Sequence, residues 1–94
     1  MVTLDTIEGT VNGAVSWHYD VGADVLYLRR VGTLDVPTLG EESDDGLIEL
    51  LNESTGTLVG LTIVGWWKRF GKGNFPDSIR EVEASIEPWA QRAA

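Results

Sequence analysis

Apolar and polar residues alternate in residues 15–20, and this period of two predicts a half-buried β-strand. A turn follows, in which Gly22 permits a left-handed backbone and Asp24 can bond nearby amides. Residues 25–30 carry apolar side chains on both faces, which is typical of a strand that lies centrally or under a second layer. The two strands therefore predict an antiparallel hairpin.

The same plan recurs further along the chain. Residues 47–51 and 57–66 have the pattern of two strands, and residues 52–56 between them have the Asn-to-Gly composition of a turn. Because a two-stranded hairpin is only marginally stable alone in water, we expect the two hairpins to pair into one sheet.

The segments outside the hairpins predict edge strands. Residues 1–13 contain Gly9 and Gly13, which argue against a long helix, and we expect an added edge strand there. A short strand around Pro37 would also be an edge strand, because proline cannot donate a hydrogen bond to a neighbouring strand. Residues 41–46 are rich in carboxylates and predict a solvated turn. Their spacing is not that of an EF-hand loop, so we expect no metal site.

A helix is predicted at the C-terminal end. Ser78 and Glu81 have the spacing of a capping box, with Ser78 as the N-cap. Four apolar residues recur at intervals of three and four: Ile79, Val82, Ile86 and Trp89. This stripe faces the sheet or a partner. Pro88 lacks an amide donor, so we expect a helix over about residues 77–87 that stops or kinks at its end, with Trp89 in a short final turn.

Together these elements predict an α+β fold. We expect residues 1–94 to form one domain, with core hairpins at 14–66 and a twisted antiparallel sheet of four to six strands against one C-terminal helix. Such a thin layer leaves one face or edge uncovered. A homodimer that packs two sheets, or extends one sheet across a two-fold axis, would cover it.

Two motifs in the hairpins resemble a known family. The first is YDVGADVLYL, residues 19–28, and the second is DGLIELLNESTGTLVGLTI, residues 45–63. They are similar to the motifs YDxxADxLYI and DGVIxxxxxxGxLVGIEI of domain-of-unknown-function family 2283, over about residues 17–64. The chain departs from this family in a long insert at residues 32–45 and in Thr62, where the family usually has Glu. The family has no established activity. Because some members are similar to the antitoxin-like partner of a RelE-type toxin, the resemblance implies a small basic protein as a partner.

Composition excludes several classes of site. The 94 residues include no cysteine and one histidine, so we expect neither a disulfide framework nor a histidine-rich metal site. No apolar run approaches the roughly 18 residues of a membrane span. The N-terminus lacks the basic and apolar regions of a signal peptide. We therefore expect a cytoplasmic protein without membrane contact.

The net charge of −8 is unevenly distributed. Residues 1–60 hold eleven acidic and two basic residues, whereas residues 61–94 hold four acidic and five basic residues. An acidic body repels nucleic acid at long range, so nucleic acid is an unfavoured partner. The charge suits either simple solvation or docking on a basic partner.

The most unusual stretch is GWWKRFGKGNF, residues 65–75. Its aromatic and basic residues interleave: Trp66, Trp67, Lys68, Arg69 and Phe70. One interpretation is that the aromatics complete the last strand and cover the core while the basic side chains reach solvent. A second is a protein interface, because Trp and Arg are typical hot-spot residues. A third is that residues 66–72 bind single-stranded nucleic acid by base stacking and phosphate contacts.

His18 is the only side chain with an ordinary pKa near neutral pH. Ser16 and Asp20 share its strand face, but such neighbours lie about 6.5–7 Å apart, too far for a nucleophile–base hydrogen bond. Asp20 and Asp24 bracket the first turn, and we expect their carboxylates to bond the backbone of that turn.

The sequence thus predicts a non-enzymatic protein-interaction module, a homodimer without a cofactor. The expected contact residues are those of the aromatic–basic stretch and of the helix stripe. One alternative is a small-molecule-binding protein or small enzyme with a site near His18, Asp20 and Asp24. Another is a binder of single-stranded nucleic acid.

Overall fold

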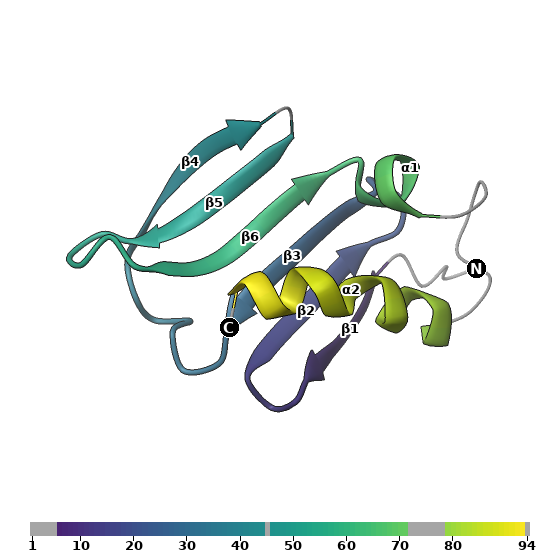
Figure 1. Ribbon diagram of the computed structural model, residues 1–94, viewed down its shortest axis with the longest axis horizontal. Coiled ribbons are helices and arrows are strands. Elements are labelled where there is room, and N and C mark those ends of the chain that lie inside the picture. The colour runs from purple at the N-terminus through teal and green to yellow at the C-terminus, as the bar shows by residue number, and fades with distance from the viewer. Residues whose placement is uncertain (1–5, 45, 72–78, 94) are drawn as a thin grey trace.

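The computed structural model describes residues 6–44, 46–71 and 79–93 (Figure 1). Six β-strands and two α-helices follow one another along them: β1 (Thr6–Val11), β2 (Val15–Asp20), β3 (Val25–Arg30), β4 (Thr38–Asp44), β5 (Leu47–Asn52), β6 (Leu58–Val64), α1 (Trp66–Phe70) and α2 (Ile79–Ala93). The strands form one antiparallel sheet in the order β1-β2-β3-β6-β5-β4. An α+β fold with an antiparallel sheet and a C-terminal helix is confirmed. The sheet has six strands, two more than the two predicted hairpins supply.

Pairing of β3 with β6 joins the two hairpins into one sheet. The strands β1 and β4 add one edge each, so β3, apolar on both faces, lies in the interior of the sheet. The tight turn between β1 and β2 contains Asn12 and Gly13, with positive φ angles of 53° and 64°. Asn-Gly is a preferred pair for such conformations, and it places β1 beside β2.

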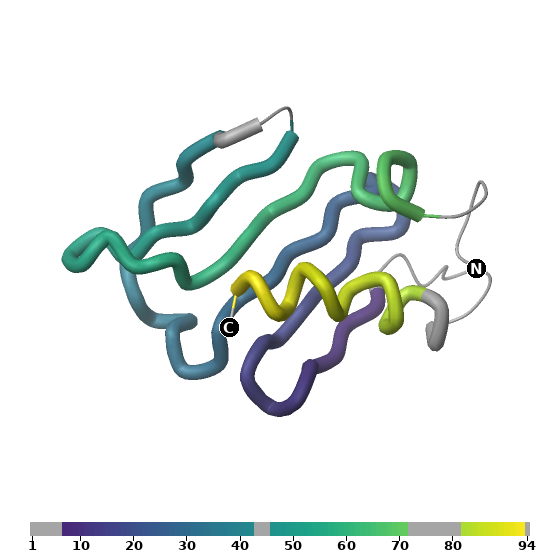
Figure 2. The backbone as a smooth tube through the Cα atoms, in the orientation of Figure 1, coloured from purple at the N-terminus to yellow at the C-terminus, as the bar shows by residue number. Residues whose placement is uncertain are grey.

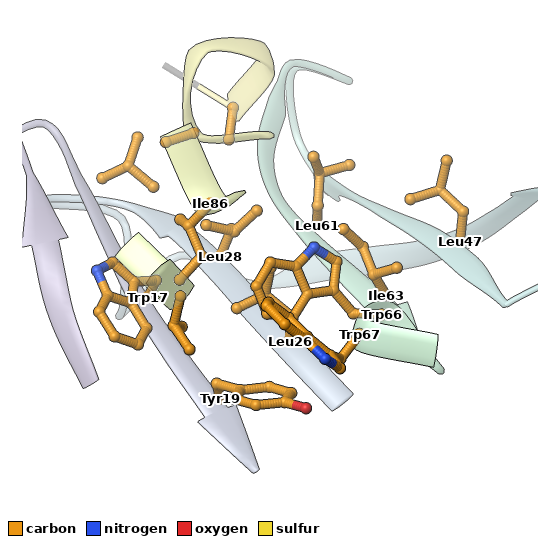
Figure 3. Close-up of a cluster of buried hydrophobic side chains, with 14 residues drawn as sticks. Trp17, Tyr19, Leu26, Leu28, Leu47, Leu61, Ile63, Trp66, Trp67 and Ile86 are labelled. Atoms are coloured by element: carbon orange, nitrogen blue, oxygen red, sulfur yellow. The ribbon is translucent and has the colours of Figure 1, made fainter. Parts of the chain in front are cut away.

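One face of the sheet carries the core. Its aligned residues include Tyr19, Leu26 and Ile63 in one row across β2, β3 and β6, and Trp17, Leu28 and Leu61 in the next. All are buried, and Figure 3 shows their side chains packed together. The helix α2 lies across this face and contributes Val82, Ile86, Ala90 and Ala93 to the core.

The helix covers only part of the sheet. In Figure 2 the yellow tube of α2 crosses the region of β1, β2 and β3, and the β4–β5 hairpin extends beyond it. No described helix lies on the opposite face of the sheet. We call this opposite surface the open face.

Two sequence predictions about local structure were wrong. Glu41 and Glu42 lie within β4, and the register shifts between Glu42 and Asp44, so the predicted acidic turn is mostly strand. The helix does not stop at Glu87 but continues through Pro88 to Ala93. Proline removes one helical hydrogen bond, to the carbonyl of Ala84. Because Ala84 and Pro88 are both exposed, water can hydrate that carbonyl. The predicted N-cap, Ser78, lies outside the described residues.

The aromatic–basic stretch does not continue the last strand. Gly65, at φ 68°, ends β6 and starts the short helix α1. This left-handed conformation is accessible to glycine at little cost. The turn brings both Trp66 and Trp67 into the core instead of placing them on opposite faces of a strand.

Candidate interaction site

Asp24 holds three elements together. Its carboxylate accepts hydrogen bonds from the backbone N–H groups of Trp67, at 2.8 Å, and Lys68, at 3.0 Å. It also accepts one from the hydroxyl of Tyr19, at 2.7 Å. The backbone carbonyl of Asp24 accepts from Gly65. Asp24 therefore caps the start of α1, and its expected bonds to its own turn are replaced by bonds to a segment 43 residues away.

The phenol of Tyr19 is part of the same arrangement. Burial, the hydrogen bond to Asp24 and the charge of that carboxylate raise the pKa of Tyr19 well above its usual range. The neutral phenol is therefore held as a donor. Tyr19 and Asp24 form a structural unit, and neither points into a described cavity.

Asp20 has the predicted role in the first turn. Its carboxylate accepts a hydrogen bond from the backbone N–H of Ala23, at 3.1 Å. Of the three residues in the predicted ligand site, only His18 lines a groove. The structure thus does not bring His18, Asp20 and Asp24 together as one site.

The residues predicted to make partner contacts separate into two groups. Trp66, Trp67, Val82 and Ile86 are core residues, with the two indoles packed edge-on 5.6 Å apart. The stripe of α2 therefore faces the sheet. Buried indoles cannot stack on bases or serve as exposed hot spots, so the assignment of both tryptophans to a contact surface was wrong for the single chain. The side chain of Ile79 lies outside the described part.

The second group forms a surface cluster. The rings of Phe70 and Trp89 lie 4.8 Å apart, although they belong to α1 and α2. The guanidinium carbon of Arg69 is 5.0 Å from the centre of the Phe70 ring, and that of Arg92 is 5.6 Å from Trp89. Lys68 of α1 is exposed as well. This cluster ties α1 to α2 by aromatic and cation–π contacts.

The open face presents an apolar centre. Register places Tyr27 of β3 beside Thr62 of β6, which pairs in turn with Ile48 of β5. Val64 lies in the neighbouring row. Tyr27 and Val64 are 43% and 46% exposed, which is unusual for such residues on interior strands.

A groove of about 530 Å³ lies at one end of the open face. It is lined by Glu8, Gly9, Thr10, Ser16, Trp17, His18, Tyr27, Arg29 and Leu34. His18 packs edge-on against Tyr27, with ring centres 5.5 Å apart, and its Nδ1 lies 3.7 Å from a Glu8 carboxylate oxygen. The groove thus joins the apolar centre to a polar margin.

The groove does not contain a nucleophile–base pair among its described residues. The hydroxyl of Ser16 donates to the backbone carbonyl of Arg29, at 3.3 Å. The guanidinium of Arg29 donates to the carbonyls of Thr33 and Val36, which fixes the loop that carries Leu34. The polar groups of Ser16 and Arg29 therefore support the wall of the groove.

The sequence pattern contained the signal for the open face. Residues 25–30 and 58–64 are apolar on both faces of the sheet. The helix α2 can cover only one of these two faces. The capping role of Asp24 was missed, because nothing local to that residue points to α1.

Two kinds of feature are absent from the described residues. No cluster of three or more His, Cys, Asp or Glu side chains is arranged to hold a metal ion there. None of the helices in this part of the chain has the length and apolar character needed to cross a membrane. Comparison of the chain with protein-family models, curated proteins and solved structures found no match.

Proposed function

We propose that this protein is a non-enzymatic interaction module that forms a homodimer by packing the open faces of two sheets together. The observation that carries this proposal is the apolar centre of the open face, with Tyr27 and Val64 nearly half exposed on interior strands. A sheet normally buries an apolar face against a second layer, and no described element supplies one here.

The distribution of residues over the open face supports an interface. Its centre, on β3, β6 and β5, is apolar, whereas polar side chains such as Glu8, His18 and Glu42 lie on the strands near its two edges. An apolar centre with a polar rim is typical of protein interfaces. In two copies related by a two-fold axis, the apolar centre of one open face would pack against the same centre of the other, as in isologous dimers. Two packed sheets also form a common two-layer architecture.

Tyr27→Glu tests this proposal. A carboxylate in the middle of the interface would be buried beside its symmetry mate without a partner, so we expect the dimer to dissociate at least about tenfold more readily. Because Tyr27 is exposed in the single chain, the sheet should still fold. Analytical ultracentrifugation gives the mass, and circular dichroism checks the fold.

Leu39→Glu is the matched control. Leu39 is 56% exposed but lies on the other side of the sheet, by alternation from Gly40. It should leave the mass unchanged. A wild-type chain that is monomeric at high concentration, or a Tyr27→Glu variant with the mass and affinity of the wild type, would refute the proposal.

The other predicted functions have weaker support. The groove beside His18 has room for a small molecule, but Ser16 and Arg29 in its lining hydrogen-bond backbone carbonyls of the protein itself. Binding of single-stranded nucleic acid has less support, because two of the residues expected to stack on bases, Trp66 and Trp67, are buried. A basic toxin as partner rests on the family resemblance alone.

A further inference from the structure

The two edges of the sheet differ in how well they are protected. On β4, the register shift between Glu42 and Asp44 and the nearby Pro37 hinder the addition of a further strand. On β1, the pairing with β2 is regular from Thr6 to Val11, with neither a bulge nor a proline. No described strand pairs with the outer side of β1. Its backbone is therefore the better template for strand addition.

A groove of about 390 Å³ runs beside this edge, between β1 and α2. It is lined by Thr10, Val11, Asn12, Trp17, Glu83, Ala84 and Glu87. Glu83 and Glu87 are one helical turn apart and exposed, so both carboxylates line the same side. None of its described lining residues is basic. The groove is therefore suited to positively charged side chains.

Trp17 supplies a second and independent indication of a ligand. Its side chain lines the groove and is only 3% exposed, yet its indole N–H has no hydrogen-bond acceptor among the described residues. The indole nitrogen lies directly under β1, where a Cβ atom on Gly9 would be 3.0 Å from it. Figure 3 shows this nitrogen on the edge of the ring that faces β1. Among the described residues, the fully buried nitrogens without a partner are those of Trp66 and Trp67, so the Trp17 nitrogen keeps contact with solvent at the groove. An acceptor that enters the groove would bond it.

We infer that the edge of β1 binds an extended, lysine- or arginine-rich segment of another protein as a seventh strand. Main-chain hydrogen bonds to β1 provide the pairing, and alternate basic side chains of the segment reach Glu83 and Glu87. An oxygen of the segment accepts from the indole of Trp17. A second copy of this chain is a poor occupant, because it would bring its own glutamates to the same groove on a chain of net charge −8. This edge is separate from the open face, so the inference does not depend on the homodimer.

The probe is a short acetylated peptide of alternating lysine and valine, added to the 15N-labelled full chain. We expect the cross-peak of the Trp17 indole N–H and the backbone amides of residues 6–11 to shift, and the amides that face the peptide to exchange more slowly with solvent. The control peptide has glutamate in place of lysine and should cause no shifts. Binding should weaken as salt is raised.

The double variant Glu83→Gln, Glu87→Gln should weaken binding of the lysine peptide about tenfold. The matched control is Glu53→Gln, an exposed acid in the turn between β5 and β6, which should bind as the wild type does. Both variants change surface residues only, so folding is preserved. Repeating the titration in the Tyr27→Glu background should give the same affinity, which separates this inference from the proposed dimer.

Three results would overturn the inference. The first is that the lysine peptide causes no shifts at Trp17 and β1, or causes shifts only at β4. The second is that the glutamate peptide binds equally well, or that the double variant binds as tightly as the wild type. The third is that the β1 amides shift with protein concentration in the absence of peptide, which would identify a second copy as the occupant.

Discussion

At the scale of single residues, Asp24 connects distant segments of the fold. It sits at φ 55°, a conformation that aspartate tolerates better than most residues, and three donors converge on its carboxylate. The motif residues Tyr19 and Asp24 thereby connect the β2–β3 hairpin to α1. The pairing gives both residue types a structural role.

Replacing Asp24 should destabilise the fold. We expect Asp24→Ala to lower the free energy of unfolding by about 3 kcal/mol, because it removes a helix cap and leaves the buried Tyr19 hydroxyl without its acceptor. Asp24→Asn keeps one acceptor and should cost about 1 kcal/mol. Asp20→Ala, which removes one exposed turn hydrogen bond, is the control and should cost less than Asp24→Ala. Urea unfolding measures all three, and equal losses for Asp20→Ala and Asp24→Ala would contradict the assignment.

Tyr19 should make stability depend on alkaline pH. Its pKa is raised in the folded chain above the value of about 10 in the unfolded chain. Folding therefore favours the protonated phenol. This contribution is complete below pH 10 and is lost as the pH rises from there toward the folded pKa, at up to about 1.4 kcal/mol per pH unit.

The variant Tyr19→Phe isolates this effect. Urea unfolding at a series of pH values above 10 should show a shallower decline for Tyr19→Phe than for the wild type. The control variant Tyr27→Phe retains Tyr19. The part of the decline in the free energy of unfolding that Tyr19 causes should therefore be unchanged in it. An identical decline in Tyr19→Phe and the wild type would show that another group is responsible.

At the scale of elements, α2 is secured at both its face and its C-terminal end. Its buried stripe packs on the sheet, and the Nε of Arg30 donates to the carbonyl of Ala93, at 3.3 Å. Arg92 lies 4.0 Å from Glu49 of β5. These contacts explain why the helix continues past Pro88: the last turn contributes Ala90 and Ala93 to the core, which outweighs one missing hydrogen bond.

Pro88→Ala should stabilise the protein. The substitution restores the amide donor and removes the clash of the proline ring with the carbonyl of Ala84, and we expect a gain of about 1–3 kcal/mol in thermal or urea unfolding. Pro37→Ala, in the loop before β4, is the control and should not produce this gain. A loss of stability in Pro88→Ala would mean that the proline ring makes favourable contacts that outweigh the helical hydrogen bond.

At the scale of the whole molecule, both described helices, α1 and α2, lie on the same face of a six-stranded sheet. They cover the core face over part of the sheet, and the open face keeps its apolar centre. The proposed dimer and the proposed strand addition at β1 follow from this shortage of covering structure. They use different surfaces, a face and an edge, so one chain can make both contacts at once.

Much of the fold could be predicted from local pattern. Alternation predicted β2, β3, β5 and β6, and the stripe at Val82 and Ile86 predicted the buried side of α2. The pair Asn12-Gly13 is a further local signal, for the hairpin of β1 and β2. These features are local because strands and helices repeat every two or 3.6 residues.

The sequence by itself thus determined the strands of the two central hairpins, the helix α2 and the presence of more apolar surface than one layer buries. Only the tertiary structure decided which face α2 covers, that Trp66 and Trp67 enter the core, and that the indole of Trp17 lies under Gly9 beside an acidic groove. The physical reason is distance along the chain. The carboxylate of Asp24 meets its amide donors 43 and 44 residues away, and such contacts depend on the packing of whole elements.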